Sequence, residues 1–281
     1  MIKIVTDSTV ALTPEEREKY DITIVPLTIQ IDGTVYEDGV TLDREEFLDL
    51  MANSKALPTS SQPAIGKFVD VYDALYAQNP EVEIISVHLS SGLSGTIHAA
   101  EQAAQLTKAK VTTFDSLTTD RGQAFIVLEA VKMAQAGASV AEIMEKMIFV
   151  REHQHVYLSF TSLKNMVAGG RLGKAAGAIG GLLNIKIGAT VDDEGKVEVV
   201  MKGRGMKSIE KFHEQIIAEM QQYKEMISIE VAHAGIPEVA DKMAERMRSL
   251  FPNAEVVSMT TTPVISTHTG VGVLAILFYA I

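Results

Sequence analysis

The chain has 281 residues, of which 47% are hydrophobic and 22% are charged, a composition typical of a folded globular protein rather than a disordered or fibrous one. Its formal net charge of −11 opposes non-specific binding to nucleic acid, which requires a basic surface. The absence of Cys excludes disulfides, thiolate metal sites and thiol nucleophiles, and it is typical of a reducing cytosol. The sequence begins without the basic and apolar regions of a secretory signal, so we expect a cytoplasmic protein.

Strands and helices alternate through the first half of the sequence. Runs rich in Ile and Val predict strands, and amphipathic segments separate them; these runs span residues 2–5, 22–31, 82–89 and 111–114. Thr13 and Ser139 each open a sequence with Glu three residues later, which predicts a capped helix start. The alternation indicates an α/β fold with a parallel sheet.

The second half changes character after Phe160. A glycine-rich stretch at residues 167–173 precedes a predicted hairpin, and the later elements are a helix at 206–220, a strand at 227–232, a helix at 239–247 and strands near Val256 and Val273. The length of the chain favours two packed α/β domains. We expect them to span residues 1–160 and 161–281.

Two loops rich in hydroxyl groups stand immediately before predicted helices. Ser94 and Gly95 belong to the loop Ser-Ser-Gly-Leu-Ser-Gly-Thr, and Ser60 and Ser61 belong to the loop Thr-Ser-Ser-Gln-Pro. The free N–H groups and positive dipole end of a helix N-terminus favour an anion, even without Lys or Arg. The alternative for each loop is an ordinary helix cap or turn.

His268 stands between small polar residues and glycines, just before the last predicted strand. An imidazole can donate to an anion or carry a proton, although a lone His is more often structural. Asp7 and Asp115 each end a predicted parallel strand, at the sheet edge where ligands of α/β proteins bind, or they act as caps. A hydrolytic centre of Ser94, His268 and one of these Asp residues is therefore an alternative to anion binding.

Other signatures of enzymes are incomplete. The stretch after Val167 has Ala168 and Ala175 where a phosphate loop requires Gly and Ser or Thr. His153 and His155 are two residues apart and could face a metal from one side of a strand, but we expect no carboxylate partner to complete a metal site. We expect no metal, no cofactor and no catalytic residue.

The order and spacing of several motifs over essentially the whole chain resemble the DegV family. These motifs are the opening Ile-Val-Thr-Asp-Ser, the Ser-Ser-Gln-Pro loop, the Ser-Ser-Gly-Leu-Ser-Gly-Thr loop, Phe-Asp-Ser and the late His-Thr-Gly-Val-Gly. The resemblance implies a two-domain fold, with a parallel-sheet domain followed by a domain with a mixed sheet, and a long-chain fatty acid such as palmitate or oleate at their interface. It also implies a role as the binding subunit of bacterial fatty acid kinase.

Carried over by position, the resemblance assigns the carboxylate of the fatty acid to Ser60, Ser61, Ser94, Gly95 and His268. It also suggests that Arg171 and Arg204 face the kinase, the alternative being that both are solvated surface side chains. The leading hypothesis is a non-catalytic subunit that presents a fatty acid to a separate ATP-dependent kinase. The acyl phosphate would then pass to an acyltransferase for phospholipid synthesis.

Two rival hypotheses come from other functional classes. One is a stand-alone acyl hydrolase that uses Ser94 and His268, and the other is a DNA-binding regulator, which the negative charge disfavours.

Overall fold

The computed structural model describes residues 1–172 and 185–281, so Gly173, the last residue of the glycine-rich stretch, and Ala175 lie outside the described residues. The helices are α1 (Pro14–Lys19), α2 (Arg44–Asn53), α3 (Ile65–Gln78), α4 (Thr96–Ala104), α5 (Asp120–Gln135), α6 (Val140–Glu152), α7 (Lys164–Ala168), α8 (Met206–Met220), α9 (Pro237–Leu250) and α10 (Pro263–Thr269). The strands are β1 (Ile2–Asp7), β2 (Ile22–Val25), β3 (Thr28–Ile31), β4 (Thr34–Glu37), β5 (Thr59–Ser61), β6 (Glu83–His88), β7 (Lys110–Asp115), β8 (Gln154–Phe160), β9 (Ile185–Val191), β10 (Val197–Arg204), β11 (Met226–His233), β12 (Glu255–Thr260) and β13 (Leu274–Ala280).

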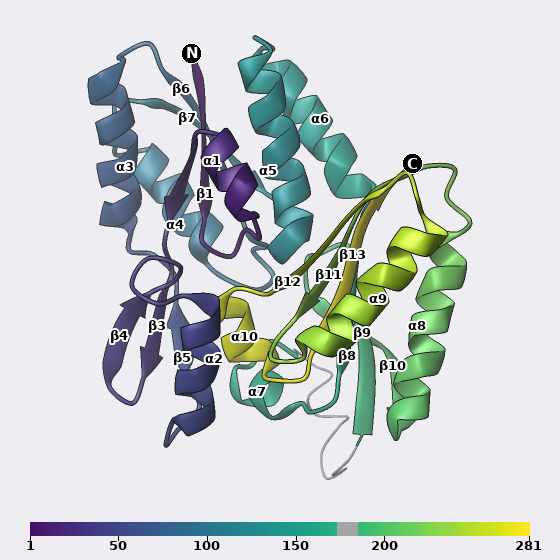
Figure 1. Cartoon of the computed structure of the whole chain (residues 1–281). Helices are drawn as coiled ribbons and strands as arrows, with labels where there is room; N and C mark the ends of the chain where they lie inside the picture. Colours follow the sequence, from purple (N-terminus) through teal and green to yellow (C-terminus); the bar gives the residue numbers. More distant parts are fainter. Residues whose placement is uncertain (173–184) are drawn as a thin grey trace.

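A four-stranded parallel sheet in the order β2-β1-β6-β7 forms the first layer of the fold, as predicted from the alternating pattern (Figure 1). Successive side chains of a strand point to opposite faces. Ile4 and Ile85 therefore pack on one face against α5, whereas Val5 and Ile84 pack on the other against α3 and α4.

Both predicted capping boxes are present. The Thr13 hydroxyl accepts from the Glu16 backbone N–H at the start of α1, and the Ser139 hydroxyl accepts from the Glu142 N–H at the start of α6. Each Glu side chain returns a hydrogen bond to the backbone of its cap. The helix starts are thus fixed by local sequence.

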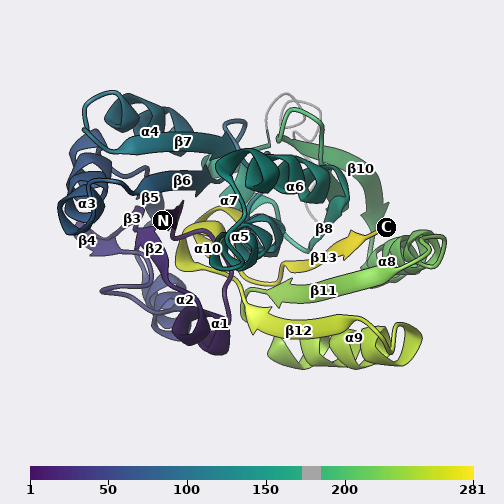
Figure 2. The same ribbon diagram turned by 90° about the horizontal axis from the view of Figure 1, so that it is seen from above.

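A six-stranded mixed sheet in the order β10-β9-β8-β13-β11-β12 forms the second layer. Helices α8 and α9 cover its outer face, where Ile229 and Phe278 are buried (Figure 2). The inner face turns toward α5 and the four-stranded sheet. Because β8 belongs to this sheet, the second layer begins a few residues before the boundary expected near residue 160.

A small antiparallel sheet in the order β4-β3-β5 packs against α2 below the parallel sheet (Figure 1). The expectation of one strand over residues 22–31 was wrong, because the chain leaves the parallel sheet at Pro26 and β3 starts a new sheet. Pro lacks the N–H that would continue the ladder. The rearrangement brings β5, with Ser60, beside β3.

Within residues 1–172 and 185–281, no helix combines the length and apolar character needed to cross a lipid bilayer.

Arg121 of α5 is buried and joins α5 to α1 through Glu16. Its guanidinium donates to both carboxylate oxygens of Glu16, at 2.6 and 2.7 Å, and to the carbonyl of Ala11 at 3.1 Å. Burial alone raises the pKa of Glu16, but the hydrogen bonds and charge of Arg121 outweigh it, so the pKa is lowered overall. The ion pair stabilises the folded chain only while Glu16 is ionised.

We predict that Glu16→Gln lowers the free energy of unfolding at pH 7 by about 3 kcal/mol, because it leaves the buried Arg121 charge uncompensated. The lowered pKa belongs to the folded state, so the contribution of Glu16 is fully present above the ordinary Glu pKa and is lost as the pH falls through the folded value. Urea unfolding should therefore show the difference between wild type and variant shrinking in acid. Glu18→Gln, at an exposed position of the same helix, is the matched control, and a difference independent of pH would contradict the prediction.

Candidate functional site

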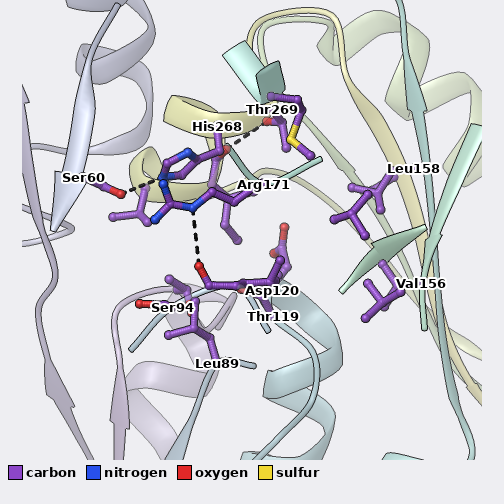
Figure 3. A pocket seen from close by; sticks show the side chains of 18 of the residues that line it. Ser60, Leu89, Ser94, Thr119, Asp120, Val156, Leu158, Arg171, His268 and Thr269 are labelled. Atoms are coloured by element: carbon purple, nitrogen blue, oxygen red, sulfur yellow. Dashed lines mark hydrogen bonds between the residues drawn. The ribbon is translucent and has the colours of Figure 1, made fainter. Parts of the chain in front are cut away.

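An apolar cavity lies between the carboxyl ends of the parallel sheet and the inner face of the mixed sheet (Figure 3). Paired residues of β8 and β13, namely Val156 with Leu277 and Leu158 with Ala275, form one wall. Leu89, which follows β6, lies on the opposite side. The empty space of the cavity together with the open solvent at its mouth amounts to about 860 Å³.

Polar side chains gather at one end of this cavity. Ser60 of β5, Ser94 of the loop before α4, His268 of α10 and Arg171 all line it. Ser60 Oγ and His268 Nε2 share a hydrogen bond of 2.7 Å. Residues 208 positions apart in the sequence are thus brought together, and we call Ser60, Ser94, Arg171 and His268 the head-group cluster.

His268 is a neutral imidazole in this environment. Burial, and then the positive charge of Arg171, lower the pKa of His268 to about 4. Its Nδ1 atom is buried and has no hydrogen-bond partner in the described part of the chain. A neutral imidazole carries one N–H, so His268 can donate one hydrogen bond and accept another.

Gly169 allows the chain to approach His268 closely. A Cβ atom on Gly169 would collide with His268 Nδ1. Gly169 also holds Arg171, because its carbonyl accepts from Arg171 Nη1 at 2.6 Å. The glycine-rich stretch therefore positions two members of the head-group cluster.

Arg171 lies at the cavity and is half-buried, with its Nε donating to the carbonyl of Leu93 at 3.4 Å. Burial lowers the pKa of Arg171, but a guanidinium remains charged near neutral pH. The sequence had suggested Arg171 for a partner surface, whereas the structure brings it beside Ser94 and His268 (Figure 3).

None of the remaining residues assigned from the resemblance lines the cavity. Ser61 is exposed and is not among the lining residues of the cavity, since neighbours on strand β5 point to opposite faces. Gly95 is the N-cap of α4, and a side chain there would collide with Gln62. Arg204 is exposed at the end of β10 and does not line the cavity.

A shallow groove adjoins the head-group cluster from outside. It shares Leu93, Ser94, Arg171 and Val197 with the cavity and adds Lys196 and other residues of the segments 91–95 and 169–170. Small residues, Arg171 and Lys196 therefore surround the mouth of the cavity, with Lys196 ion-paired to Glu194. A negatively charged group can approach the polar end from this side.

The groups required for a Ser-His-Asp hydrolase are engaged elsewhere. Ser94 Oγ is 2.9 Å from Thr96 Oγ1, and Asp115 accepts from the backbone N–H groups of Ser91 and Leu117. Asp7 is 3.1 Å from His88 Nδ1 rather than near His268. Among the described residues, neither Asp completes a triad with Ser94 and His268.

Asp7 instead begins a fully buried polar chain. His88 Nε2 lies 2.7 Å from Ser86 Oγ, which in turn lies 2.8 Å from Tyr72 Oη. Burial alone raises the pKa of Asp7, but the hydrogen bond and charge of His88 outweigh it and the pKa is lowered. The chain is sealed from solvent, so it stabilises the end of β6 rather than meeting a substrate.

Sequence reasoning missed Gln62, Thr119 and Asp120, all of which line the cavity. Thr119 and Asp120 follow β7, so the rule that ligands gather at carboxyl ends of parallel strands could have found them.

Across residues 1–172 and 185–281, no group of three or more His, Asp or Glu residues is arranged to hold a metal ion.

Comparisons with known proteins agree with the sequence resemblance. A family model described as "Uncharacterised protein, DegV family" matches residues 1–280. The DegV domain-containing protein YejH of Lactococcus lactis is 40% identical over 277 residues, which cover 98% of this chain and 98% of that protein.

Solved structures share the fold over nearly the same length. DegV, a fatty acid binding protein from Bacillus subtilis, is 30% identical with a TM-score of 0.90 and covers 100% of this chain and 99% of its own. A stearic acid-binding protein from Eubacterium ventriosum is 26% identical with a TM-score of 0.87, covering 99% of this chain and 98% of its own. With a family match that leaves out a single residue, the chain belongs to the DegV family.

Proposed function

We propose that the chain binds a long-chain fatty acid, with the hydrocarbon in the cavity and the carboxylate at the head-group cluster. The observation that carries this proposal is the joining of an apolar cavity to hydroxyl, imidazole and guanidinium groups at one end. Each methylene removed from water contributes about 0.8 kcal/mol. The fatty-acid-binding relatives from Bacillus subtilis and Eubacterium ventriosum support the same ligand class.

The head-group cluster suits a carboxylate better than a neutral ligand. Arg171 supplies the positive charge and several N–H donors, and hydrogen bonds between ionised groups are stronger than neutral ones. Ser60 and Ser94 each supply a hydroxyl donor, and neutral His268 supplies one N–H. The start of α4 adds the favourable end of a helix dipole beside Ser94.

We further infer that the bound carboxylate is presented to a separate ATP-dependent kinase, and that an acyltransferase consumes the acyl phosphate. The groove supports this role, because it gives a phosphate-bearing partner access to Ser94 and Arg171 of the head-group cluster. The sequence lacks a complete phosphate loop, so the magnesium and nucleotide sites would belong to the partner.

Ser94→Ala and Ser60→Ala should each weaken fatty-acid binding by roughly tenfold or more, because each removes a hydrogen bond to a charged group worth about 1.5–3 kcal/mol. Native mass spectrometry of the protein purified from a bacterial host should detect a fatty acid in the wild type. Titration of the lipid-free proteins then gives the affinities. Ser61→Ala is the matched control and should bind like wild type, whereas equal affinity in all four proteins would place the carboxylate elsewhere.

Gly169→Ala should also weaken fatty-acid binding, since the new methyl group displaces His268 from Ser60. Gly66→Ala is the control, because a Cβ at this position in α3 meets no atom within 4 Å. Titration calorimetry measures the effect on affinity, and thermal unfolding tests whether both variants remain folded. Wild-type affinity in a folded Gly169→Ala protein would show that the position of His268 does not matter for binding.

Variants of Arg171 and Arg204 should distinguish fatty-acid binding from presentation of the fatty acid to the kinase. Arg171→Ala should lose the bound fatty acid, because the carboxylate loses its cation. Arg204→Glu should retain the fatty acid but slow association with the kinase, with a changed dependence on salt. Kinase-coupled turnover at several salt concentrations is the measurement. Unchanged turnover of Arg204→Glu would exclude Arg204 from the partner surface.

A further inference from the structure

Several polar side chains line the cavity outside the head-group cluster, and two of them are adjacent in the sequence. Thr119 and Asp120 line it between the loop after β7 and the start of α5. Figure 3 shows Asp120 between the head-group cluster and the apolar side chains of Val156 and Leu158. Polar groups in this part of the cavity are not needed to hold a carboxylate at the head-group cluster.

Asp120 is held in an unusual backbone conformation. Its φ of 58° lies in the left-handed region, which residues other than Gly seldom adopt and Asn and Asp tolerate best. Its side chain is 5% exposed and its Oδ2 accepts a hydrogen bond from the Thr261 hydroxyl. The other oxygen, Oδ1, is buried and finds no hydrogen-bond partner within residues 1–172 and 185–281.

Thr119 supplies a second unsatisfied atom next to Asp120. It is the N-cap residue of α5, yet its hydroxyl makes no capping hydrogen bond, although a Thr at this position normally caps the helix. Thr119 Oγ1 is buried and likewise lacks a partner among the residues described. Buried polar atoms in proteins are almost always paired, so a ligand in this cavity can supply the partner for both atoms.

Thr9 provides a comparison within the same cavity. It also lines the cavity, but its hydroxyl is 2.6 Å from Asp7 Oδ1 and 2.9 Å from Gln123 Oε1. Its hydrogen-bonding capacity is therefore used within the protein. Thr119 and Asp120 differ from Thr9 in this respect.

We propose that Thr119 and Asp120 form a second polar subsite, which binds a hydroxyl group on the hydrocarbon of the ligand. The preferred ligand is then a long-chain hydroxy acid, and this inference rests on the proposed fatty-acid binding. A hydroxyl has one donor and two acceptor positions, so it can donate to Asp120 Oδ1 and accept from the Thr119 hydroxyl. An unsubstituted chain leaves both atoms unpaired.

Asp120 favours a hydroxyl over a second carboxylate. Burial raises the pKa of Asp120, and a neutral carboxyl group can both accept and donate. Among the described residues that line the cavity, Arg171 of the head-group cluster is the one cation, so an ionised carboxylate beside Asp120 would be desolvated without a lining cation to pair with it. A hydroxyl is small, neutral and matched to both partners.

The test compares octadecanoic acid with a series of hydroxyoctadecanoic acids that carry the hydroxyl at different carbons, each titrated into the lipid-free protein. At least one hydroxy acid should bind about tenfold or more tightly than octadecanoic acid, because a site with unpaired polar groups discriminates against a ligand that cannot pair them. If octadecanoic acid binds and no hydroxy acid binds more tightly, the subsite is refuted while the proposed function stands. If no acid of either kind binds, the proposed function itself is wrong.

Variants test whether Thr119 and Asp120 cause the preference for a hydroxy acid. Thr119→Val removes the hydroxyl at nearly constant shape, at an extended backbone position that suits Val, and Asp120→Gly removes the carboxyl while tolerating the positive φ. Each should bring the affinity ratio of hydroxy acid to plain acid close to one. Asp120→Asn keeps an acceptor oxygen and should retain most of the preference, and Thr34→Val, exposed on β4, should retain all of it. A ratio unchanged in Thr119→Val would overturn the proposal even if Asp120→Gly fails to fold.

Discussion

The proposed ligand, with an ionised head and a long apolar tail, imposes two opposite requirements on one cavity, and the contact between the two sheets offers groups suited to each. The parallel sheet ends in loops that offer hydroxyl and N–H groups near Ser94. The inner face of the mixed sheet offers apolar side chains such as Leu158 and Leu277, which need no partner. Because the polar groups and the apolar wall come from different sheets, the cavity depends on how the sheets pack against each other.

Much of the fold could be predicted from local sequence. The capping boxes at Thr13 and Ser139, the hairpin of β9 and β10, and the strand-helix alternation are each determined by neighbouring residues. Ser94 stood out in a hydroxyl-rich loop before a helix and His268 among small polar residues and glycines, and the motifs around them resemble those of the DegV family. The comparisons confirm the family. Local patterns carry this information because caps, turns and strand runs depend on short-range hydrogen bonds and side-chain spacing.

The rest depended on tertiary contacts that no local pattern encodes. Ser61 stands next to Ser60 in sequence, but the pairing of β5 with β3 decides which of the two faces the cavity. The resemblance suggested Arg171 for the surface that faces the kinase, and only the fold shows that its contacts with Leu93 and Gly169 also hold it near His268. Asp120 carries no motif at all, and its significance follows from burial and missing partners.

The order of strands in the mixed sheet also bears on the synthesis of the protein. Strand β13 lies between β8 and β11, although both precede it in the sequence. A chain emerging from the ribosome can complete the parallel sheet early, but β8 and β11 have no strand to join them until residues 274–280 are available. Such long-range pairing is slow to form. The cavity wall contributed by Ala275 and Leu277 is therefore assembled late, and the nascent chain cannot enclose a ligand before then.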